Sequence, residues 1–255
     1  MSNIQWKDSV YRGDCIEVMD MLPMGVADFI FCDLPYGITQ NKWDSIIDLN
    51  LLWPLFWKIL KPNGCIALFS AQPFTTKLIQ SQIEHYKYEW VWVKNLKTGN
   101  LNARNRPMGG HETVQIFYKA RPVYNPQMRN RTIEQKSGNK KNSKTSNYGK
   151  QAELLLDRQS EFINPDTVLT NFKCVHNSSG KLHPTQKPVE LLEYFIRTYT
   201  NEGDTVADFT AGSLSTAEAA IKSNRHYIMV EKDPEIFSIG VKRLNKILSP
   251  LSILT

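Results

Sequence analysis

A short apolar segment that ends in a carboxylate and a turn is the feature that most constrains this 255-residue chain. Residues 29–32 are Phe-Ile-Phe-Cys, and such a run is typical of a strand buried in a parallel sheet. Residues 33–37, Asp-Leu-Pro-Tyr-Gly, follow directly. Open α/β sheets bind ligands at the carboxyl ends of their strands. The segment is therefore predicted to be a central strand that carries a site at its end, although an ordinary strand and turn explain these residues equally well.

Segments with strand and helix periodicity alternate along most of the chain. Strands are expected at 9–14, 27–33, 65–70, 88–94, 113–119, 205–209 and 226–231, and helices at 16–22, 48–60, 73–85, 188–199, 216–223 and 234–247. This alternation predicts a mostly parallel sheet with helices on both faces. The strands at 88–94 and 113–119 are expected to pair antiparallel, and the Asn-, Arg- and Gly-rich residues 95–110 between them are expected to be a loop.

Apolar spacing also predicts which side of two helices faces the core. In the helix at 48–60 the inward residues are expected to be Leu51, Leu52, Leu55, Phe56 and Ile59. In the helix at 188–199 they are expected to be Leu191, Leu192, Phe195 and Ile196.

The net charge of +6 is concentrated in residues 121–181, which hold eleven basic and five acidic residues. Periodicity fails across this segment, and residues 135–150 are almost purely polar, so we expect them to be disordered without a partner. A basic segment attached to a neutral core indicates a polyanion partner. A solvated surface loop is the alternative that basicity alone leaves open.

Composition excludes several other classes of protein. A hydrophobic content of 41% predicts a packed core, and the chain has neither an apolar run of membrane-spanning length nor a signal-peptide pattern. We therefore expect a soluble intracellular protein with no membrane contact. The four cysteines, Cys15, Cys32, Cys65 and Cys174, lack metal-ligand spacing, so no metal site is expected, and Cys32 and Cys65 are predicted to be reduced core residues.

A second strand end, far along the chain, has the composition of a cofactor site. Residues 208–216, Asp-Phe-Thr-Ala-Gly-Ser-Leu-Ser-Thr, follow a predicted strand and open a helix, and the next strand ends in Glu231. Gly212 permits a tight turn close to a ligand, and a carboxylate in the position of Glu231 accepts hydrogen bonds from ribose hydroxyls. The turn lacks G-x-G-x-x-G, which disfavours a nucleotide-dependent oxidoreductase, and a plain strand–helix junction is the alternative.

Four motifs occur in the order of one enzyme family. Residues 33–36, Asp-Leu-Pro-Tyr, look like a D-P-P-Y tetrapeptide, and residues 183–188 match H-P-T-Q-K-P. Residues 13–15 and 208–216 resemble the elements that accompany them. The chain thus resembles the permuted β-class of S-adenosylmethionine-dependent amino-group DNA methyltransferases. The resemblance implies an α/β fold with a three-layer Rossmann-like methyltransferase sheet that is circularly permuted and mostly parallel, with an antiparallel hairpin at one edge.

The resemblance also implies a division of the chain into three regions. Residues 1–120 are expected to form the catalytic half, 121–181 the basic DNA target-recognition insertion, and 182–255 the cofactor-binding half. The residues expected to bind DNA are Arg104, Arg106, Arg129, Arg131, Lys140, Lys141 and Lys144.

The catalytic residues implied are Asp33, Leu34, Pro35 and Tyr36. Asp33 and the carbonyl of Leu34 would accept hydrogen bonds from the exocyclic amine of a flipped-out base, and Tyr36 would stack on that base. Trp43, on the following loop, either helps to hold the base or packs in the core, and packing is the favoured role.

The cofactor implied is S-adenosylmethionine. Its expected ligands are Asp14, Cys15, Asp33, Thr185, Lys187, Asp208, Ala211, Gly212, Ser213 and Glu231. Asp14 and Cys15 would face the adenine ring, Glu231 the ribose and residues 208–213 the methionine part, while Thr185 and Lys187 close the site. Asp208 as a simple helix cap and His183 as a loop-orienting residue are the structural alternatives.

The sequence departs from the family pattern at two positions. Leu34 replaces the first proline of the tetrapeptide and is expected to be tolerated. Leu214 stands where the cofactor loop has a glycine, and if that position takes a positive φ the strain costs about 1–3 kcal/mol and weakens cofactor binding.

The function implied is site-specific adenine-N6 methylation of double-stranded DNA, because the initial Asp of the tetrapeptide is the adenine-type form. Cytosine-N4 methylation is the first alternative, and a DNA-binding homologue with a decayed cofactor site is the second. RNA is disfavoured by the resemblance. The resemblance is compatible with a homodimer and with a bacterial or phage-encoded protein that acts at the nucleoid in the cytoplasm.

Overall fold

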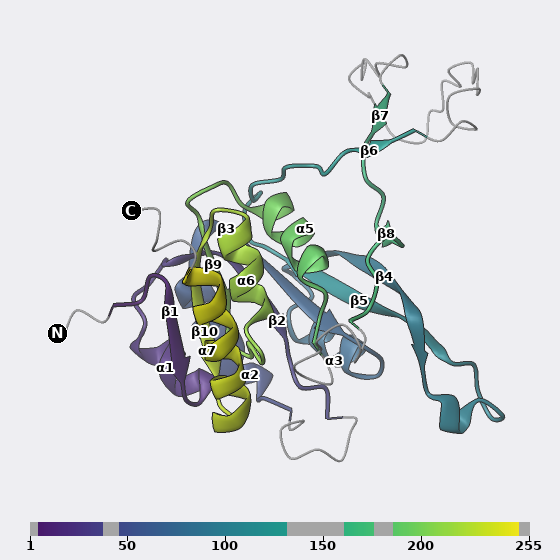
Figure 1. Cartoon of the computed structure of the whole chain (residues 1–255), viewed down its shortest axis with the longest axis horizontal. Helices are drawn as coiled ribbons and strands as arrows, with labels where there is room; N and C mark the ends of the chain where they lie inside the picture. Colours follow the sequence, from purple (N-terminus) through teal and green to yellow (C-terminus); the bar gives the residue numbers. More distant parts are fainter. Residues whose placement is uncertain (1–4, 38–45, 132–160, 176–185, 250–255) are drawn as a thin grey trace. The chain divides into compact units, whose positions relative to one another are not determined.

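The computed structural model describes residues 5–37, 46–131, 161–175 and 186–249 (Figure 1). The chain divides into two compact units. Unit 1 comprises Met1–Asn125 and Thr167–Thr255, and unit 2 comprises Pro126–Asp166.

Unit 1 is built on an eight-stranded sheet with the order β1-β10-β9-β2-β3-β5-β4-β8. The strands are β1 (Ser9–Arg12), β2 (Ala27–Asp33), β3 (Leu60–Ser70), β4 (Tyr86–Thr98), β5 (Gly109–Phe117), β8 (Val168–Leu169), β9 (Thr205–Asp208) and β10 (His226–Glu231). All pairings are parallel except those of β5 with β3 and with β4. The predicted fold, a mostly parallel sheet with an antiparallel hairpin toward one edge, is therefore confirmed, and the two-residue β8 adds a pairing that the sequence did not predict.

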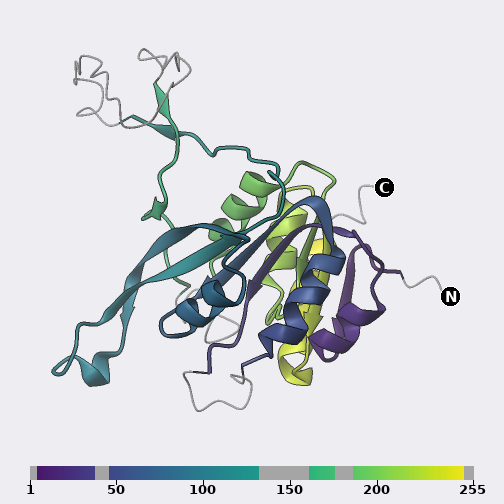
Figure 2. The ribbon, with the colours of Figure 1, turned by 180° about the vertical axis from the view of Figure 1, so that it is seen from behind.

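Helices cover both faces of this sheet. They are α1 (Cys15–Met21), α2 (Leu49–Ile59), α3 (Phe74–Ser81), the 3₁₀ turn η1 (Asn100–Asn102), α5 (Val189–Tyr199), α6 (Ser215–Lys222) and α7 (Pro234–Leu248). Helices α5, α6 and α7 lie on the face seen in Figure 1, and α1, α2 and α3 lie on the face seen in Figure 2.

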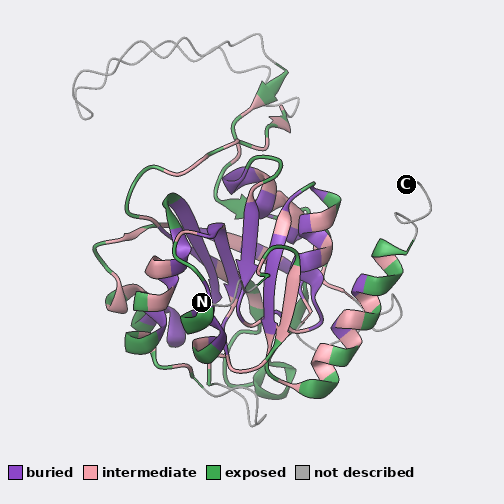
Figure 3. Ribbon diagram, turned by 90° about the vertical axis from the view of Figure 1, so that its left-hand side faces the viewer, coloured by how far each residue is buried: buried purple, intermediate pink, exposed green. Residues whose placement is uncertain are grey.

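The central strand β2 explains why there are three layers. Successive side chains of a strand point to opposite faces. Phe29 and Phe31 accordingly pack with α5 and α6, whereas Ile30 and Cys32 pack with α1 and α2. A strand that is apolar at every position has two faces to bury, so it requires helices on both sides. Figure 3 shows the result, with buried residues on the strands and exposed residues on the outer sides of the helices.

Local side-chain chemistry explains where α2 begins, whereas two predicted details of the helices are wrong. Asp48 caps α2, because its Oδ1 accepts a hydrogen bond from the backbone N–H of Asn50 at 2.9 Å. The inward face of α2 holds Leu52, Trp53 and Phe56, so the prediction that Leu51 faces inward is wrong: Leu51 is exposed. The large Trp53 ring takes the inward position. Helix α3 ends at Ser81 rather than at residue 85.

Residues 95–110, predicted to be a loop, belong largely to a hairpin arm. Strand β4 continues to Thr98 and β5 begins at Gly109, and these two residues are partners in the ladder. The side-chain pattern did not indicate this extension. The ladder is formed by the backbone N–H and C=O groups of the two strands, which can pair whatever the side chains are.

Unit 2 contains a short antiparallel pair, β6 (Arg129–Asn130) with β7 (Phe162–Ile163). The backbone N–H of Arg131 donates to the carbonyl of Glu161 at 2.8 Å and continues the pairing. The segment 135–150, predicted to be disordered, lies outside the described residues. The three-region division at 120 and 181 stays a prediction.

The described cysteines are free, and Cys32 and Cys65 are buried in β2 and β3, which confirms their predicted place in the core. No helix in the described parts of the chain is both long enough and apolar enough to cross a membrane.

Candidate active site

Two adjacent parallel strands end at the centre of the candidate site. Strands β2 and β9 are neighbours with Ile30 opposite Ala207. After β2 the chain passes to α2 on one face of the sheet, and after β9 it passes to α6 on the other face. Such a switch point opens a crevice at the carboxyl ends of the two strands, where α/β sheets bind ligands. The Oγ1 of Thr210 donates to the carbonyl of Asp33 at 3.1 Å and joins the two strand ends.

Asp33 is held through both carboxylate oxygens. The hydroxyl of Tyr36 donates to Oδ1 at 2.6 Å, and the ammonium of Lys187 donates to Oδ2 at 2.5 Å. The ring of Tyr36 stacks on Phe74 with a centroid distance of 5.5 Å, so one face of the tyrosine is covered. The side chain of Leu34 is buried in the core beneath α1 and α2, which explains how the chain accommodates leucine in place of proline.

Lys187 lies at the centre of a chain of alternating charges. Its Nζ is 3.1 Å from Oε2 of Glu112, and Oε1 of Glu112 is 2.9 Å from Nζ of Lys94. The ammonium also lies 4.7 Å from the centroid of the Phe69 ring, a cation–π distance. Buried charges are tolerated when they are paired in this way.

The pairing fixes the protonation of this cluster. Burial alone lowers the pKa of Lys187, but Asp33 and Glu112 outweigh burial and raise that pKa above its usual value. Burial alone raises the pKa of Glu112, but Lys187 and Lys94 outweigh it and lower that pKa to about 2. Lys187 is therefore an ammonium and Glu112 a carboxylate at neutral pH.

The loop after β9 is organised by Asp208. Its Oδ2 accepts from the hydroxyl of Thr216 at 2.6 Å, and its Oδ1 accepts from the N–H of Thr210 at 3.0 Å. Burial, with the nearby charges of Asp33 and Glu231, raises the pKa of Asp208 to about 7. Asp208 thus braces the start of α6 through the Thr216 hydroxyl, but it does not cap the helix, whose N-cap is Leu214 with no side-chain cap hydrogen bond.

The loop contains two residues with a positive φ, Gly212 and Leu214. Gly212 has φ +54, and no atom lies within 4 Å of the position that a Cβ would occupy, so the backbone faces open space there. Leu214 has φ +58, which is the positive value that the sequence analysis considered for this position.

Leu214 nevertheless has a place in the core. Its side chain is fully buried and lies directly over Gly240 of α7, where an added Cβ would come within 2.5 Å of the Leu214 Cγ. Burial of the leucine offsets the strain of its left-handed backbone, since full burial of such a side chain contributes about 1.5–3 kcal/mol.

A second residue of α7 holds the same loop. Nη1 of Arg243 donates to the carbonyl of Ser213 at 2.8 Å and to its Oγ at 3.1 Å. Nε of Arg243 lies 3.3 Å from Oε2 of Glu218 on α6. Ser213 is buried by these contacts, and Ala211 beside it is buried as well.

The end of β10 closes the loop on its other side. Oε2 of Glu231 accepts from the N–H of Gly212 at 2.8 Å, and Oε1 accepts from the N–H of Asp233 at 2.7 Å. Burial raises the pKa of Glu231. Asp233 caps α7, because its Oδ1 accepts from the N–H groups of Glu235 and Ile236.

The predicted adenine-facing residues lie next to this strand end. The N–H of Gly13 donates to the carbonyl of Glu231 at 3.1 Å, so β1 brings Asp14 and Cys15 to the same edge. Asp14 caps α1 through the N–H of Ile16 and pairs with Lys232 at 3.0 Å. Burial and the charge of Asp14 raise the pKa of Cys15 to about 11, so this buried side chain is a neutral thiol.

The predicted DNA-binding residues have three different outcomes. Arg104 and Arg106 are exposed in the hairpin arm. In unit 2 the guanidinium of Arg129 is engaged by Asp166 at 2.6 Å, and Arg131 lies directly after β6. Other predicted residues, Lys140, Lys141, Lys144, Trp43, His183 and Thr185, lie outside the described residues.

Four residues of the site were not predicted from the sequence: Lys94, Glu112, Gly240 and Arg243. Glu112 and Lys94 sit on facing strands far from Lys187 in the chain, and no short motif connects them. Gly240 and Arg243 lie on one side of a helix that looks like an ordinary amphipathic helix. Among the described residues, no group of three or more His, Cys, Asp or Glu side chains is arranged to hold a metal ion.

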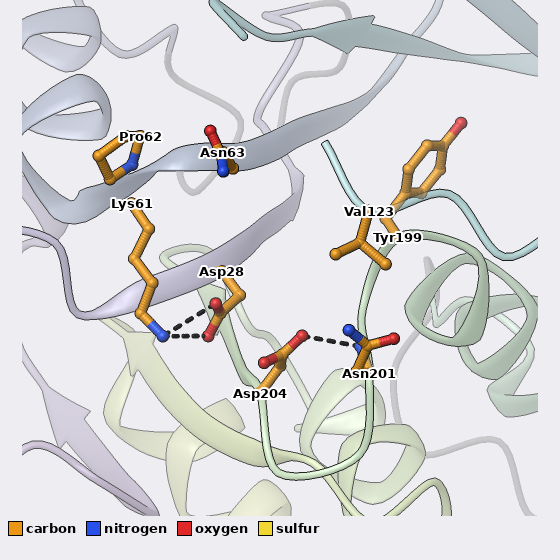
Figure 4. A pocket seen from close by; sticks show the side chains of 8 residues that line it. All are labelled: Asp28, Lys61, Pro62, Asn63, Val123, Tyr199, Asn201 and Asp204. Atoms are coloured by element: carbon orange, nitrogen blue, oxygen red, sulfur yellow. Dashed lines mark hydrogen bonds and ion pairs between the residues drawn. The ribbon is translucent and has the colours of Figure 1, made fainter. Parts of the chain in front are cut away.

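A separate cavity of about 310 Å³ lies at the opposite, amino-terminal edge of the sheet (Figure 4). Its charged groups are already satisfied: Lys61 reaches both oxygens of Asp28 at 2.8 Å, and Asp204 accepts from the N–H of Asn201 at 2.7 Å. None of the predicted site residues lines it, so the crevice at the carboxyl edge is the candidate active site.

Comparison with known proteins gives one family for this chain. Residues 27–242 match the model of a family described as DNA methylase, the N6/N4 methyltransferases. The DNA adenine methyltransferase YhdJ of Escherichia coli strain K12 is 27% identical over 262 residues, which cover 93% of this chain and 82% of YhdJ.

Two solved structures share the fold. The PvuII DNA methyltransferase, described as cytosine-N4-specific, has a TM-score of 0.66 and 18% identity, with 92% of this chain and 85% of that chain covered. The complex of M1.HpyAVI with SAM has a TM-score of 0.61 and 23% identity, with 92% of this chain and 98% of that chain covered.

Proposed function

This chain belongs to the N6/N4 DNA methylase family, and from that premise we propose that it transfers a methyl group from S-adenosylmethionine to the N6 amine of adenine in double-stranded DNA. The observation that carries the proposal is the carboxylate of Asp33 at the switch point, held by Lys187 and Tyr36 beside the glycine turn at 212. The adenine specificity of YhdJ and the initial Asp of the tetrapeptide support adenine as the base.

The residues at the crevice fit a cationic, ribose-containing donor. Asp33, Asp208 and Glu231 bring carboxylates close enough that the charges of Asp33 and Glu231 raise the pKa of Asp208. Such an acidic site favours a positively charged ligand. Gly212 leaves open space at the backbone, and Glu231 offers carboxylate oxygens for ribose hydroxyls. When bound, S-adenosylmethionine supplies a methyl group on positively charged sulfur.

Asp33 makes the N6 amine of adenine, which accepts the methyl group, a better nucleophile. The lone pair of an adenine N6 amine is delocalised into the ring, which makes the amine a weak nucleophile. A carboxylate that accepts a hydrogen bond from the amine favours a more tetrahedral nitrogen with a localised lone pair. Each carboxylate oxygen has two lone pairs, so Asp33 can accept from the base while it keeps Tyr36 and Lys187. The carbonyl of Leu34 is the second acceptor.

Lys187 and Glu112 hold this geometry and do not exchange protons with the base. Because the pKa of Lys187 is raised, its amine is not free to act as a general base. An amine that receives a methyl group from the sulfonium sulfur of the donor would have to lose one proton, and Asp33, as the carboxylate that would accept a hydrogen bond from that amine, would be placed to take it. The hydroxyl of Tyr36 bonds to Asp33 and its ring stacks on Phe74, and from this position Tyr36 would stack on the base.

Two further features are part of the proposal. The target atom is enclosed in a duplex, so the base must leave the stack. The basic residues of 121–181 would hold the phosphates, which carry most of the non-specific affinity. The proposed function is compatible with a homodimer.

The test is transfer of labelled methyl from S-adenosylmethionine to unmethylated genomic DNA, followed by nucleoside mass spectrometry. We expect N6-methyladenine from the wild type and none from Asp33→Ala. Asp20→Ala, which removes an exposed carboxylate of α1, is the matched control and is expected to retain activity. N4-methylcytosine would overturn the base assignment. Absence of both product and calorimetric cofactor binding in the wild type would favour the decayed-site alternative.

A further inference from the structure

The β4–β5 hairpin continues beyond the rest of the sheet as an arm. Strand β3 ends at Ser70, which pairs with Thr113 of β5, and Thr113 pairs with Val91 of β4. Beyond this row β5 extends to Gly109, four residues further, which is about 13 Å at the usual rise of a strand. The arm, defined as residues 95–109, is exposed at every position. Figures 1 and 2 show it projecting from the sheet with η1 at its end.

The arm leaves the sheet at the edge where Asp33 lies. Strand β4 is antiparallel to β5 and β5 is antiparallel to β3, so β4 runs in the direction of β3 and β2. Asp33 pairs with Phe69 at the end of β3. The base of the arm carries Lys94 and Glu112, which belong to the Lys187 cluster. Anything that the arm contacts is therefore on the active-site side of the sheet.

The composition of the arm fits one kind of partner. It contains Lys97, Arg104 and Arg106 and no Asp or Glu, and its turn carries Asn100, Asn102 and Asn105. Arginine and lysine bind phosphates, and asparagine and arginine recognise base edges. At the tip, between two of these asparagines, Leu101 is 100% exposed. A two-stranded ribbon fits the major groove of duplex DNA, and some proteins that bind the minor groove insert an apolar side chain such as leucine between base steps.

We propose that the arm enters a groove of the DNA beside the target base, that Arg104 and Arg106 contact its phosphates, and that Leu101 wedges into the base stack to offset the loss of the flipped base. The proposal rests on the DNA methyltransferase function proposed above. A second copy of this chain is a poorer occupant, because two arms that each carry three positive and no negative side chains repel each other.

The wedge is tested with Leu101→Ser on two forms of the mapped target duplex. In one form the target base is normally paired, and in the other it faces an abasic position, which removes most of the cost of flipping. We expect kcat/KM to fall about tenfold or more on the paired duplex and to stay near wild type on the abasic duplex. Equal activity of the variant and the wild type on the paired duplex would overturn the wedge, and so would an equal loss on both duplexes.

Ile83→Ser is the matched control. Ile83 is 60% exposed and precedes the amino end of β4, at the opposite edge of the sheet from the arm. The same loss of an exposed apolar side chain is expected to change kcat/KM on neither duplex. If Ile83→Ser lowered kcat/KM on the paired duplex as Leu101→Ser does, the effect would not belong to the arm.

The phosphate contacts have a test that does not depend on catalysis. In equilibrium binding of the wild type to a duplex, the double variant Arg104→Ala/Arg106→Ala is expected to reduce the slope of log K against log salt by about two. An unchanged slope would overturn the arm as a DNA contact. A wild type that binds with this slope but transfers no methyl would instead count against the proposed activity alone. Conversion of a dimer to a monomer by Leu101→Ser would identify a second copy as the occupant.

Discussion

The two ends of the β4–β5 hairpin are built on opposite principles. At its base, Lys94 and Glu112 are largely buried and every charge is paired with Lys187 or with each other. At its tip, Arg104, Arg106 and Leu101 are exposed, and no ion pair is formed by these residues within the described parts of the chain. A buried charge is costly unless it is paired, whereas an exposed charge costs little and stays available. One ladder of backbone hydrogen bonds thus joins the buried ion pairs that hold Asp33 to an exposed arm whose charges stay available to a partner.

The largest effect is expected at Lys187. Lys187→Met leaves Asp33 and Glu112 facing each other as like charges without their shared cation, so the variant should lose about 3–5 kcal/mol of unfolding free energy. It should also lose at least about 10²-fold in kcat, because Asp33 is no longer held. Urea unfolding and single-turnover kinetics measure the two effects. Lys97→Met in the arm is the control for stability alone, and an equal loss of unfolding free energy there would erase the difference between base and tip.

The next largest effect on stability compares a steric clash in the core with backbone strain at an exposed glycine. Gly240→Ala places a Cβ within 2.5 Å of the Leu214 Cγ, so we expect a cost of about 1–3 kcal/mol and weaker cofactor binding by calorimetry. Gly99 in the arm has φ +88, but the position of an added Cβ is open space. Gly99→Ala should therefore cost only the backbone strain of about 1–2 kcal/mol and leave cofactor affinity unchanged.

A double variant identifies the cause. In a Leu214→Ala background the clash with the leucine side chain disappears and the 3.2 Å approach to the Ser213 carbonyl carbon remains, so Gly240→Ala should cost less there than in the wild type. Strict additivity of the two substitutions would contradict the direct contact.

The pH dependence of stability is the test specific to Glu112. Because the folded-state pKa of Glu112 is lowered to about 2, its ion pairs stabilise the protein at neutral pH, and this contribution disappears as the pH falls from about 4.5 toward 2. Glu112→Gln should cost about 1–3 kcal/mol at pH 7 and should remove that part of the acid sensitivity. Unfolding measured at several pH values checks both. A variant with the same acid profile as the wild type would show that the pairing does not stabilise the fold.

The smallest effect is expected at the tip. Arg104→Ala/Arg106→Ala and Leu101→Ser should each change the unfolding free energy by no more than about 0.5 kcal/mol, since they remove exposed side chains. Thermal unfolding without DNA measures this. A larger loss would mean that the arm is part of the folded core and that the contrast between base and tip is wrong.

The sequence by itself determined the architecture and the order of the motifs. Apolar periodicity predicted β10 at its observed bounds, and it identified the four inward residues of α5, Leu191, Leu192, Phe195 and Ile196, all of which are buried. It also indicated that 33–36 and 208–216 follow strands. These features are local, because the period of a strand or a helix is contained within a few residues.

Only the tertiary structure decided which distant residues share the site. Glu112 meets Lys187 because β5 pairs with β3 in one register, and Gly240 lies beneath Leu214 because α7 packs beside α6. It also decided that residues 95–109 form an arm at the edge of the sheet where Asp33 lies. Strand register and helix packing are set by contacts between segments far apart in the chain, which no local pattern contains. The sequence therefore determined which carboxylate ends the central strand, and the fold determined which side chains hold it.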